Sequence, residues 1–240
     1  MLNRKVIITG GSRGIGAECV RAFASQGNDV AFIYKSSDEH ALLLANETGA
    51  HLIKADLSDC LSAKSACDAA IAHLGGVDIL VNNAGISHIG LFTDMTPEEY
   101  KRVMGTNFDS AVFCSQSVLS AMIHQKSGRI INVSSMWGQV GASCEVIYSA
   151  SKAALIGFTK ALAKEVGPSG ITVNCISPGV INTEMNASLD PSVLAELADE
   201  TPLSRIGTAR EVSDTVIFVA SESASFITGQ VIAVNGGMVM

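Results

Sequence analysis

The stretch Lys5-Val6-Ile7-Ile8-Thr9-Gly10-Gly11-Ser12-Arg13-Gly14-Ile15-Gly16 joins a short apolar run to a glycine-rich turn. The run Lys5–Thr9 predicts a buried strand, and the amphipathic pattern near Gly14–Gln26 predicts a helix directly after it. Glycines at such a junction let the backbone turn sharply and approach a phosphate, which the free N–H groups of the helix start attract. The spacing Gly10-x-x-x-Gly14-x-Gly16 at this position predicts a nucleotide site. A tight connection without any ligand is the alternative.

The same alternation of apolar runs and amphipathic segments continues along the whole chain. Strands are expected at Lys5–Thr9, Asp29–Tyr34, His51–Lys54, Val77–Asn82, Gly128–Ser134, Ile171–Ile176 and Gln230–Val234. Further helices are expected near Ser62–Leu74, Pro97–Gln125, Ile147–Val166 and Ala209–Ser221. This order is typical of the α/β class, a Rossmann-like, doubly wound parallel sheet with helices on both faces. We expect one domain over residues 1–240, with a substrate lid near residues 181–207, where the alternation breaks. A tolerated surface loop is the alternative.

Composition excludes several classes of function. The 240 residues carry a formal net charge of −7, which argues against nucleic acid as a partner, since phosphate binding needs a basic surface. No apolar run approaches the roughly 18 residues of a membrane span. The six cysteines include no Cys-x-x-Cys pair and the five histidines are dispersed, so we expect neither disulfides nor a metal site. Free thiols suit a reducing environment and predict a cytoplasmic protein.

Tyr148 and Lys152 lie four residues apart within a predicted helix. Side chains with this spacing share one helical face, and an ammonium group beside a phenol lowers the phenol's pKa from about 10. Such a tyrosine can exchange a proton with an alcohol or a carbonyl near neutral pH. The pair is also compatible with an ordinary helix surface.

The end of the second predicted strand indicates the type of nucleotide. An acidic residue there would bind the adenine ribose and select NAD, but the chain has Tyr34-Lys35-Ser36 instead. Lys35 and Arg13 could hold a 2′-phosphate by charge-assisted hydrogen bonds, which favours NADP(H) over NAD(H). Both cations could also be solvated surface residues.

Four motifs together resemble the short-chain dehydrogenase/reductase family. They are Thr9-Gly10-x-x-x-Gly14-x-Gly16, Asn82-Asn83-Ala84-Gly85, Tyr148-x-x-x-Lys152, and a serine at the family's spacing before the tyrosine, which selects Ser135 over Ser134. The resemblance covers essentially the whole chain. The runs 202–207 and 227–238 are most similar to bacterial 3-oxoacyl-(acyl-carrier-protein) reductases.

The resemblance implies four catalytic residues. Tyr148 would be the general acid of carbonyl reduction, and Lys152 would lower its pKa and bind the nicotinamide ribose. Ser135 would donate a hydrogen bond to the substrate carbonyl. Asn107 would support a water relay that ends at the lysine; alternatively, it is a helix-kink residue that bonds its own backbone.

The resemblance also implies a set of cofactor contacts. It assigns them to Gly10, Ser12, Arg13, Gly14, Ile15, Gly16, Tyr34, Lys35, Ser36, Asp56, Leu57, Asn83, Ala84, Gly85, Tyr148, Lys152, Pro178, Gly179, Ile181 and Thr183. Asn83 has an alternative role as a brace of the central sheet.

The implied activity is NADPH-dependent reduction of 3-oxoacyl thioesters, on acyl carrier protein or coenzyme A, to 3-hydroxyacyl thioesters. A carrier would dock near Arg129, but Ser169 stands where a second arginine is expected, which leaves the carrier open. The family usually forms homotetramers. One alternative is an NAD(P)-dependent dehydrogenase of a free secondary alcohol, steroid or sugar, and another is a non-catalytic NADP-binding module.

Overall fold

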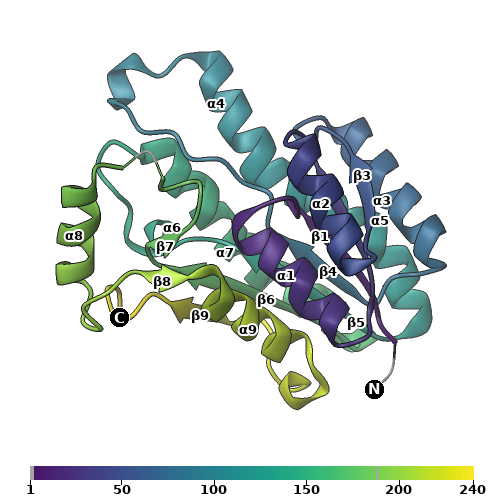
Figure 1. The fold of residues 1–240 in the computed structure, drawn as a ribbon. Coiled ribbons are helices and arrows are strands. Elements are labelled where there is room, and N and C mark those ends of the chain that lie inside the picture. The colour runs from purple at the N-terminus through teal and green to yellow at the C-terminus, as the bar shows by residue number, and fades with distance from the viewer. Residues whose placement is uncertain (1–2, 188) are drawn as a thin grey trace.

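A computed structural model describes residues 3–187 and 189–240 and forms a seven-stranded sheet with the order β3-β2-β1-β4-β5-β6-β9 (Figure 1). The strands are β1 (Lys5–Thr9), β2 (Asp29–Tyr34), β3 (His51–Lys54), β4 (Ile79–Asn82), β5 (Gly128–Val133), β6 (Ile171–Pro178) and β9 (Val231–Val234). Each neighbouring pair in this sheet is parallel. The strand order reverses between β1 and β4, and ligands of such sheets bind at the carboxyl ends beside this point.

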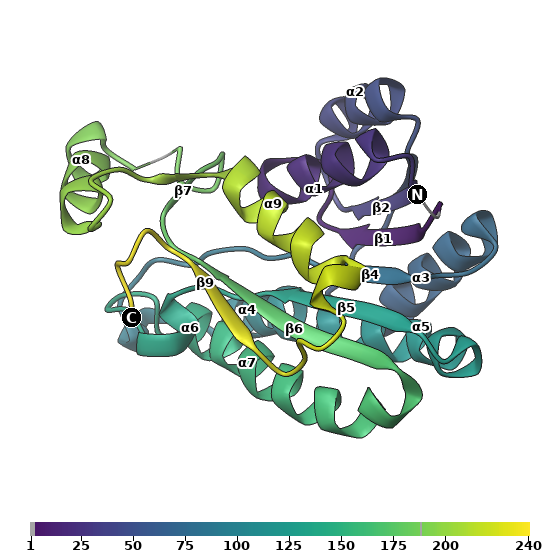
Figure 2. The same cartoon turned by 90° about the horizontal axis from the view of Figure 1, so that it is seen from below.

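Helices cover both faces of the sheet (Figure 2). On one side are α1 (Gly14–Ser25), α2 (Asp38–Thr48) and α9 (Ala209–Ala220), and on the other are α3 (Cys60–Leu74), α5 (Ser110–Gln125) and α7 (Val146–Val166). Strand β1 shows why its apolar run is continuous. Val6 and Ile8 pack into the core under α1 and α9, whereas Ile7 packs into the core under α3 and α5, so neither face meets water.

The predicted helix Pro97–Gln125 is wrong as a single unbroken α-helix. Helix α4 (Pro97–Met104) passes through a wider π-turn at Gly105–Asp109 before α5 begins. A π-turn offsets the two halves of a helix and is common at functional sites. Here it contains Asn107, one of the predicted site residues.

Helix α2 was missing from the prediction. Its start, Ser37, has a left-handed φ of 73° and no side-chain cap, and Leu42 and Leu43 are exposed. The apolar stripe of this helix is short, with only Ala41 and Leu44 buried, although Ser37 and Gly49 at its two ends are residue types that mark helix ends in a sequence.

Residues 181–207 form an excursion whose two ends are paired. Strands β7 (Ile181–Asn182) and β8 (Gly207–Thr208) make a two-stranded parallel sheet, and α8 (Pro191–Glu200) lies between them. The remaining short elements are α6 (Trp137–Val140) and the 3-10 turns Phe92–Asp94, Gly167–Ser169 and Glu222–Ala224.

Candidate active site

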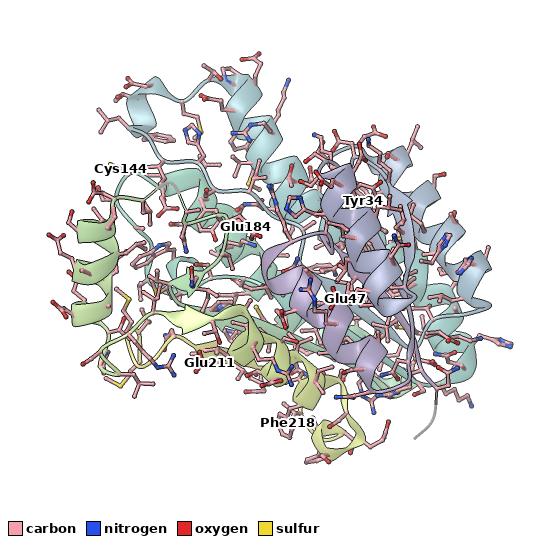
Figure 3. All side chains as sticks on the ribbon, in the orientation of Figure 1. Tyr34, Glu47, Cys144, Glu184, Glu211 and Phe218 are labelled. Carbon is pink, nitrogen blue, oxygen red and sulfur yellow. The ribbon has the colours of Figure 1, made fainter. Side chains whose placement is uncertain are left out.

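A cleft of about 470 Å³ opens at the carboxyl ends of β1, β2 and β4, where Figure 3 labels Tyr34 and Glu184 on two of its sides. Most of the residues predicted to bind a cofactor line it. They are Gly10, Ser12, Arg13, Gly14, Ile15, Tyr34, Lys35, Ser36, Asp56, Leu57, Asn83, Ala84, Gly85 and Thr183. The structure thus brings together residues from five separate parts of the chain at the switch point of the sheet.

The glycine loop is packed so closely that two of its positions have no room for a side chain. Gly10 has a φ of +66°, and a Cβ added there would lie 2.9 Å from Ala84 Cα, while a Cβ at Gly16 would collide with Gly10 O. Helix α1 begins after Arg13 without a side-chain cap and without an acidic residue in its first turn. Its first N–H groups are available to a phosphate, so this cradle fits the pyrophosphate of a dinucleotide.

Asn83 fastens this loop to the sheet. Its side-chain amide donates to Thr9 O and Gly10 O, both at 3.1 Å, and the Thr9 hydroxyl accepts from the backbone N–H of Asn83 at 3.0 Å. The predicted alternative, a brace of the central sheet, therefore describes its contacts, although Asn83 also lines the cleft.

Basic and acidic side chains alternate at the carboxyl ends of β2 and β3, on one side of the cleft. Lys35 Nζ lies 2.6 Å from Asp56 Oδ2, and Lys54 Nζ lies 2.7 Å from Asp38 Oδ2. Arg13 lines the same cleft and is in no ion pair within residues 3–187 and 189–240. Arg13 and Lys35 are both exposed and only Lys35 has a carboxylate partner, so a bound 2′-phosphate would take up the positive charge that Asp56 leaves unpaired.

Ser135, Tyr148 and Lys152 meet beyond the end of β5, on the buried side of the long helix α7. The Lys152 Nζ lies 5.8 Å from the centre of the Tyr148 ring. Burial raises the pKa of Tyr148 to about 12. The hydrogen bond between Tyr148 and Ser135 lowers this pKa, but by less than burial raises it. The neighbouring Ser134 hydroxyl instead donates to Lys152 O at 2.7 Å, so of the two serines Ser135 is the one that faces the tyrosine.

The electrostatics differ from the expected lowering of the Tyr148 pKa by Lys152. The lysine Nζ is buried and donates to Val133 O at 2.9 Å, and burial lowers its pKa to about 8. The surrounding protein therefore keeps the phenol protonated near neutral pH, as a proton donor must be, and places the ammonium group near its titration point.

Asn107 ties the cleft wall to α7 by side-chain hydrogen bonds. It accepts from Ile86 N at 2.8 Å and donates to Ile86 O and to Ser151 Oγ, both at 3.0 Å. Ser151 Oγ in turn donates to Tyr148 O at 2.7 Å. The alternative in which Asn107 bonds its own helix is wrong, because its partners lie on other segments.

Six predicted contacts lie outside the cleft lining. Gly16 and Ile181 are packed in the interior, and the others are Tyr148, Lys152, Pro178 and Gly179. Ile181 is the clearest difference, because its side chain belongs to the core under α1 and α9. The cleft also contains residues absent from the prediction, namely Ile33, Ala55, Ile86, Ser87, Arg102, Thr106, Glu184 and Met185. Ala55 and Glu184 are sequence neighbours of the predicted contacts Asp56 and Thr183, so they could have been predicted as cleft residues from their positions.

The predicted docking role of Arg129 does not agree with its position. Its side chain is 6% exposed and its guanidinium lies 3.3 Å from Glu222 Oε2, while Glu222 Oε1 pairs with Arg4. Arg129 is near the start of β5, at the opposite end of the strand from Ser135. The guanidinium is thus enclosed within the protein, where an acidic partner cannot reach it directly.

The part of the chain that the structure describes holds neither a cluster of metal-ligating side chains nor a membrane-spanning helix. No group of three or more His, Cys, Asp or Glu side chains is arranged there to hold a metal ion. None of the helices in residues 3–187 and 189–240 has the length and apolarity needed to cross a membrane.

Two solved structures share this fold over nearly the whole chain. A blue fluorescent protein from a metagenomic library, in complex with NADPH, has a TM-score of 0.93 and 37% identity, covering 100% of this chain and 99% of that one. A Serratia marcescens short-chain dehydrogenase/reductase mutant has a TM-score of 0.91 and 34% identity, with coverages of 97% and 96%.

Proteins of similar sequence belong to the same group as these structural neighbours. The acetoacetyl-CoA reductase of Rhizobium meliloti is 43% identical over 98% of both chains. The 3-oxoacyl-(acyl-carrier-protein) reductase FabG of Chlamydia trachomatis is 39% identical over 99% of this chain and 98% of that protein. A family model described as enoyl-(acyl carrier protein) reductase matches residues 10–239. With the glycine cradle and the Ser135–Tyr148–Lys152 cluster, these matches show that the chain belongs to the short-chain dehydrogenase/reductase family.

Proposed function

We propose that this protein is an NADPH-dependent reductase that converts 3-oxoacyl thioesters to 3-hydroxyacyl thioesters. The observation that carries the proposal is the meeting of two hydroxyl groups, Ser135 and Tyr148, with the buried Lys152 beside a dinucleotide-shaped cleft. The acetoacetyl-CoA reductase activity named for the relative at 43% identity supports the choice of a 3-oxoacyl thioester.

The cofactor assignment is part of this proposal. The glycine loop would hold the pyrophosphate at the start of α1, and Arg13 and Lys35 would hold the 2′-phosphate that distinguishes NADP from NAD. The NADPH bound to the structural relative at 37% identity supports this assignment. When bound, the nicotinamide supplies the hydride that adds to the substrate carbon.

The residues of the chain would supply the proton and position the carbonyl. Ser135 and Tyr148 donate hydrogen bonds to the carbonyl oxygen, where negative charge develops as the carbon is reduced. Tyr148 then gives its phenolic proton to this oxygen, which completes the alcohol. Burial disfavours the phenolate that remains, and the positive charge of Lys152 offsets this cost. Asn107 holds Tyr148 in place through Ser151.

The proposal also covers the acyl carrier, the lid over the cleft and the contact between subunits. Because Arg129 is enclosed, a thioester of either coenzyme A or a carrier protein would enter from the cleft side without that contact. Residues 181–207, which reach the cleft at Thr183, would form the lid. The exposed Phe218 and Phe226 support a subunit contact in a homotetramer; Phe218 projects from the outer end of α9 (Figure 3).

The test is steady-state oxidation of NADPH with acetoacetyl-CoA, with NADH in parallel. The Tyr148→Phe variant is the control for the proton donor, and it should bind NADPH normally while losing about 10²- to 10⁴-fold in turnover. Crotonyl-CoA, which has a carbon–carbon double bond in place of the ketone, should not be reduced. Turnover of crotonyl-CoA but not of acetoacetyl-CoA, or near-normal turnover by Tyr148→Phe, would contradict the proposed reaction.

A further inference from the structure

The first turn of the 181–207 excursion carries a carboxylate to the start of α1. Glu184 lines the cleft together with Gly14, and a Cβ added at Gly14 would lie 3.6 Å from Glu184 Oε2. Figure 3 shows Glu184 beside the loop that precedes α1. An acidic side chain is thus located where, under the proposed function, the pyrophosphate of the cofactor would bind.

Backbone contacts hold this turn in place. Asn186 N donates to Thr183 O at 3.0 Å, and Asn186 Nδ2 donates to Ile181 O at 2.8 Å. Ile181 is itself buried and paired with Gly207. These contacts position the main chain at Glu184, and its carboxylate can still turn away from the cradle by rotation of the side chain.

The charge of Glu184 is not neutralised by a neighbour. Within residues 3–187 and 189–240 it is in no ion pair, although Arg13 lines the same cleft. A carboxylate near the positive end of a helix is favourable by itself, because it interacts with the free N–H groups and the helix dipole. The same position is unfavourable once a phosphate group, which needs those N–H groups, approaches.

We propose that Glu184 acts as a built-in competitor of the cofactor pyrophosphate and lowers the affinity of the protein for dinucleotides. The proposal rests on the proposed function, because it assumes that a dinucleotide occupies the glycine cradle. Its effect is independent of the 2′-phosphate, since NADPH and NADH carry the same pyrophosphate. Glu184 therefore sets how tightly either nucleotide binds, whereas Lys35 sets the preference between them.

The experiment measures the dissociation constants of NADPH and NADH by isothermal titration calorimetry, without substrate, for the wild type and Glu184→Gln. Glutamine keeps the size of the side chain and removes its charge, so both nucleotides should bind about 3- to 10-fold more tightly. The gain should shrink in about 0.5 M NaCl, because salt screens exposed charges. The ratio of the two dissociation constants should not change.

Two control variants separate this effect from others. Glu196→Gln, on the exposed surface of α8, makes the same change in net charge away from the cleft and should leave both dissociation constants unchanged. Lys35→Ala should weaken NADPH and not NADH. Unchanged or weaker binding by Glu184→Gln, with normal binding by the wild type, would overturn the role of Glu184. Failure of the wild type to bind either nucleotide would instead overturn the proposed function itself.

Discussion

Replacing Lys152 by methionine should make the protein more stable at neutral pH while it removes most of the activity. The Lys152 side chain is almost fully enclosed, with 4% of the residue exposed. Burial lowers its pKa from 10.5 to about 8, so near neutral pH the folded protein still carries the charge and its desolvation cost. Methionine has a similar length and no charge, and can fill the same space.

The magnitude follows from the pKa and from one hydrogen bond. A fall from 10.5 to about 8 corresponds to roughly 3 kcal/mol of stability. Methionine loses the hydrogen bond from Nζ to Val133 O, which is worth about 1 kcal/mol. The net expectation is a gain of roughly 2 kcal/mol in the free energy of unfolding.

The sign of the pH dependence is specific to a buried amine. The folded-state pKa of Lys152 is below the unfolded value, so between about pH 8 and 10.5 the unfolded chain binds more protons. The stability contributed by this site in the wild type therefore rises with pH over that range. The advantage of methionine should be full below about pH 8 and should disappear as the pH passes about 10.5.

Urea unfolding, followed by circular dichroism near neutral pH and in steps to about pH 11, measures this difference. Lys160→Met on the exposed side of the same helix is the matched control and should show no such dependence. Other titrating groups are common to all variants and cancel in the comparison. A Lys152→Met protein that is less stable near neutral pH, or a difference that does not change with pH, would refute the reasoning.

Two further predictions concern sites away from the cleft. Burial and the stacked His73 ring at 3.6 Å lower the pKa of His51, so the unfolded chain binds more protons and stability should fall as the pH drops through about 6.5. His51→Gln should reduce that slope in urea titrations, and an unchanged slope would contradict it. Glu222→Gln should destabilise the fold by about 1 kcal/mol, because the substitution leaves the buried Arg129 without its charged partner. The loss is small because the Glu222 side chain is 72% exposed. The double variant with Arg129→Met should recover that loss, and a further loss would show that Arg129 has another role.

Much of the fold could be predicted because strands and their connections leave strong local signals. The predicted bounds of Lys5–Thr9, Asp29–Tyr34 and His51–Lys54 match the structure, since each is an apolar run between turn residues. The predicted strand Ile171–Ile176 is two residues longer in the structure, ending at Pro178. Pro178 has no N–H to donate, but its carbonyl accepts a hydrogen bond from Met136 N at 2.9 Å.

The sequence motifs predict which residues form the site but not the electrostatic environment of their side chains. The motifs brought Ser135, Tyr148 and Lys152 together correctly, because helical spacing fixes the last two on one face. Their pKa values could not be predicted from spacing, because burial by distant parts of the chain outweighs the effect of one residue on the other. The enclosure of Arg129 is a tertiary effect of the same kind, since Glu222 lies far away in sequence.

The pairing of Ile181 with Gly207 has a consequence for how this protein can vary. The short β7–β8 sheet joins the two ends of the excursion at its base. The distance between these two ends therefore does not depend on the length of the segment between them. Insertions between closed ends cost little, since each doubling of loop length adds only about 0.6 kcal/mol. An insertion between Met185 and Gly207 should therefore cost little stability, while Thr183 and Glu184 keep their places in the cleft.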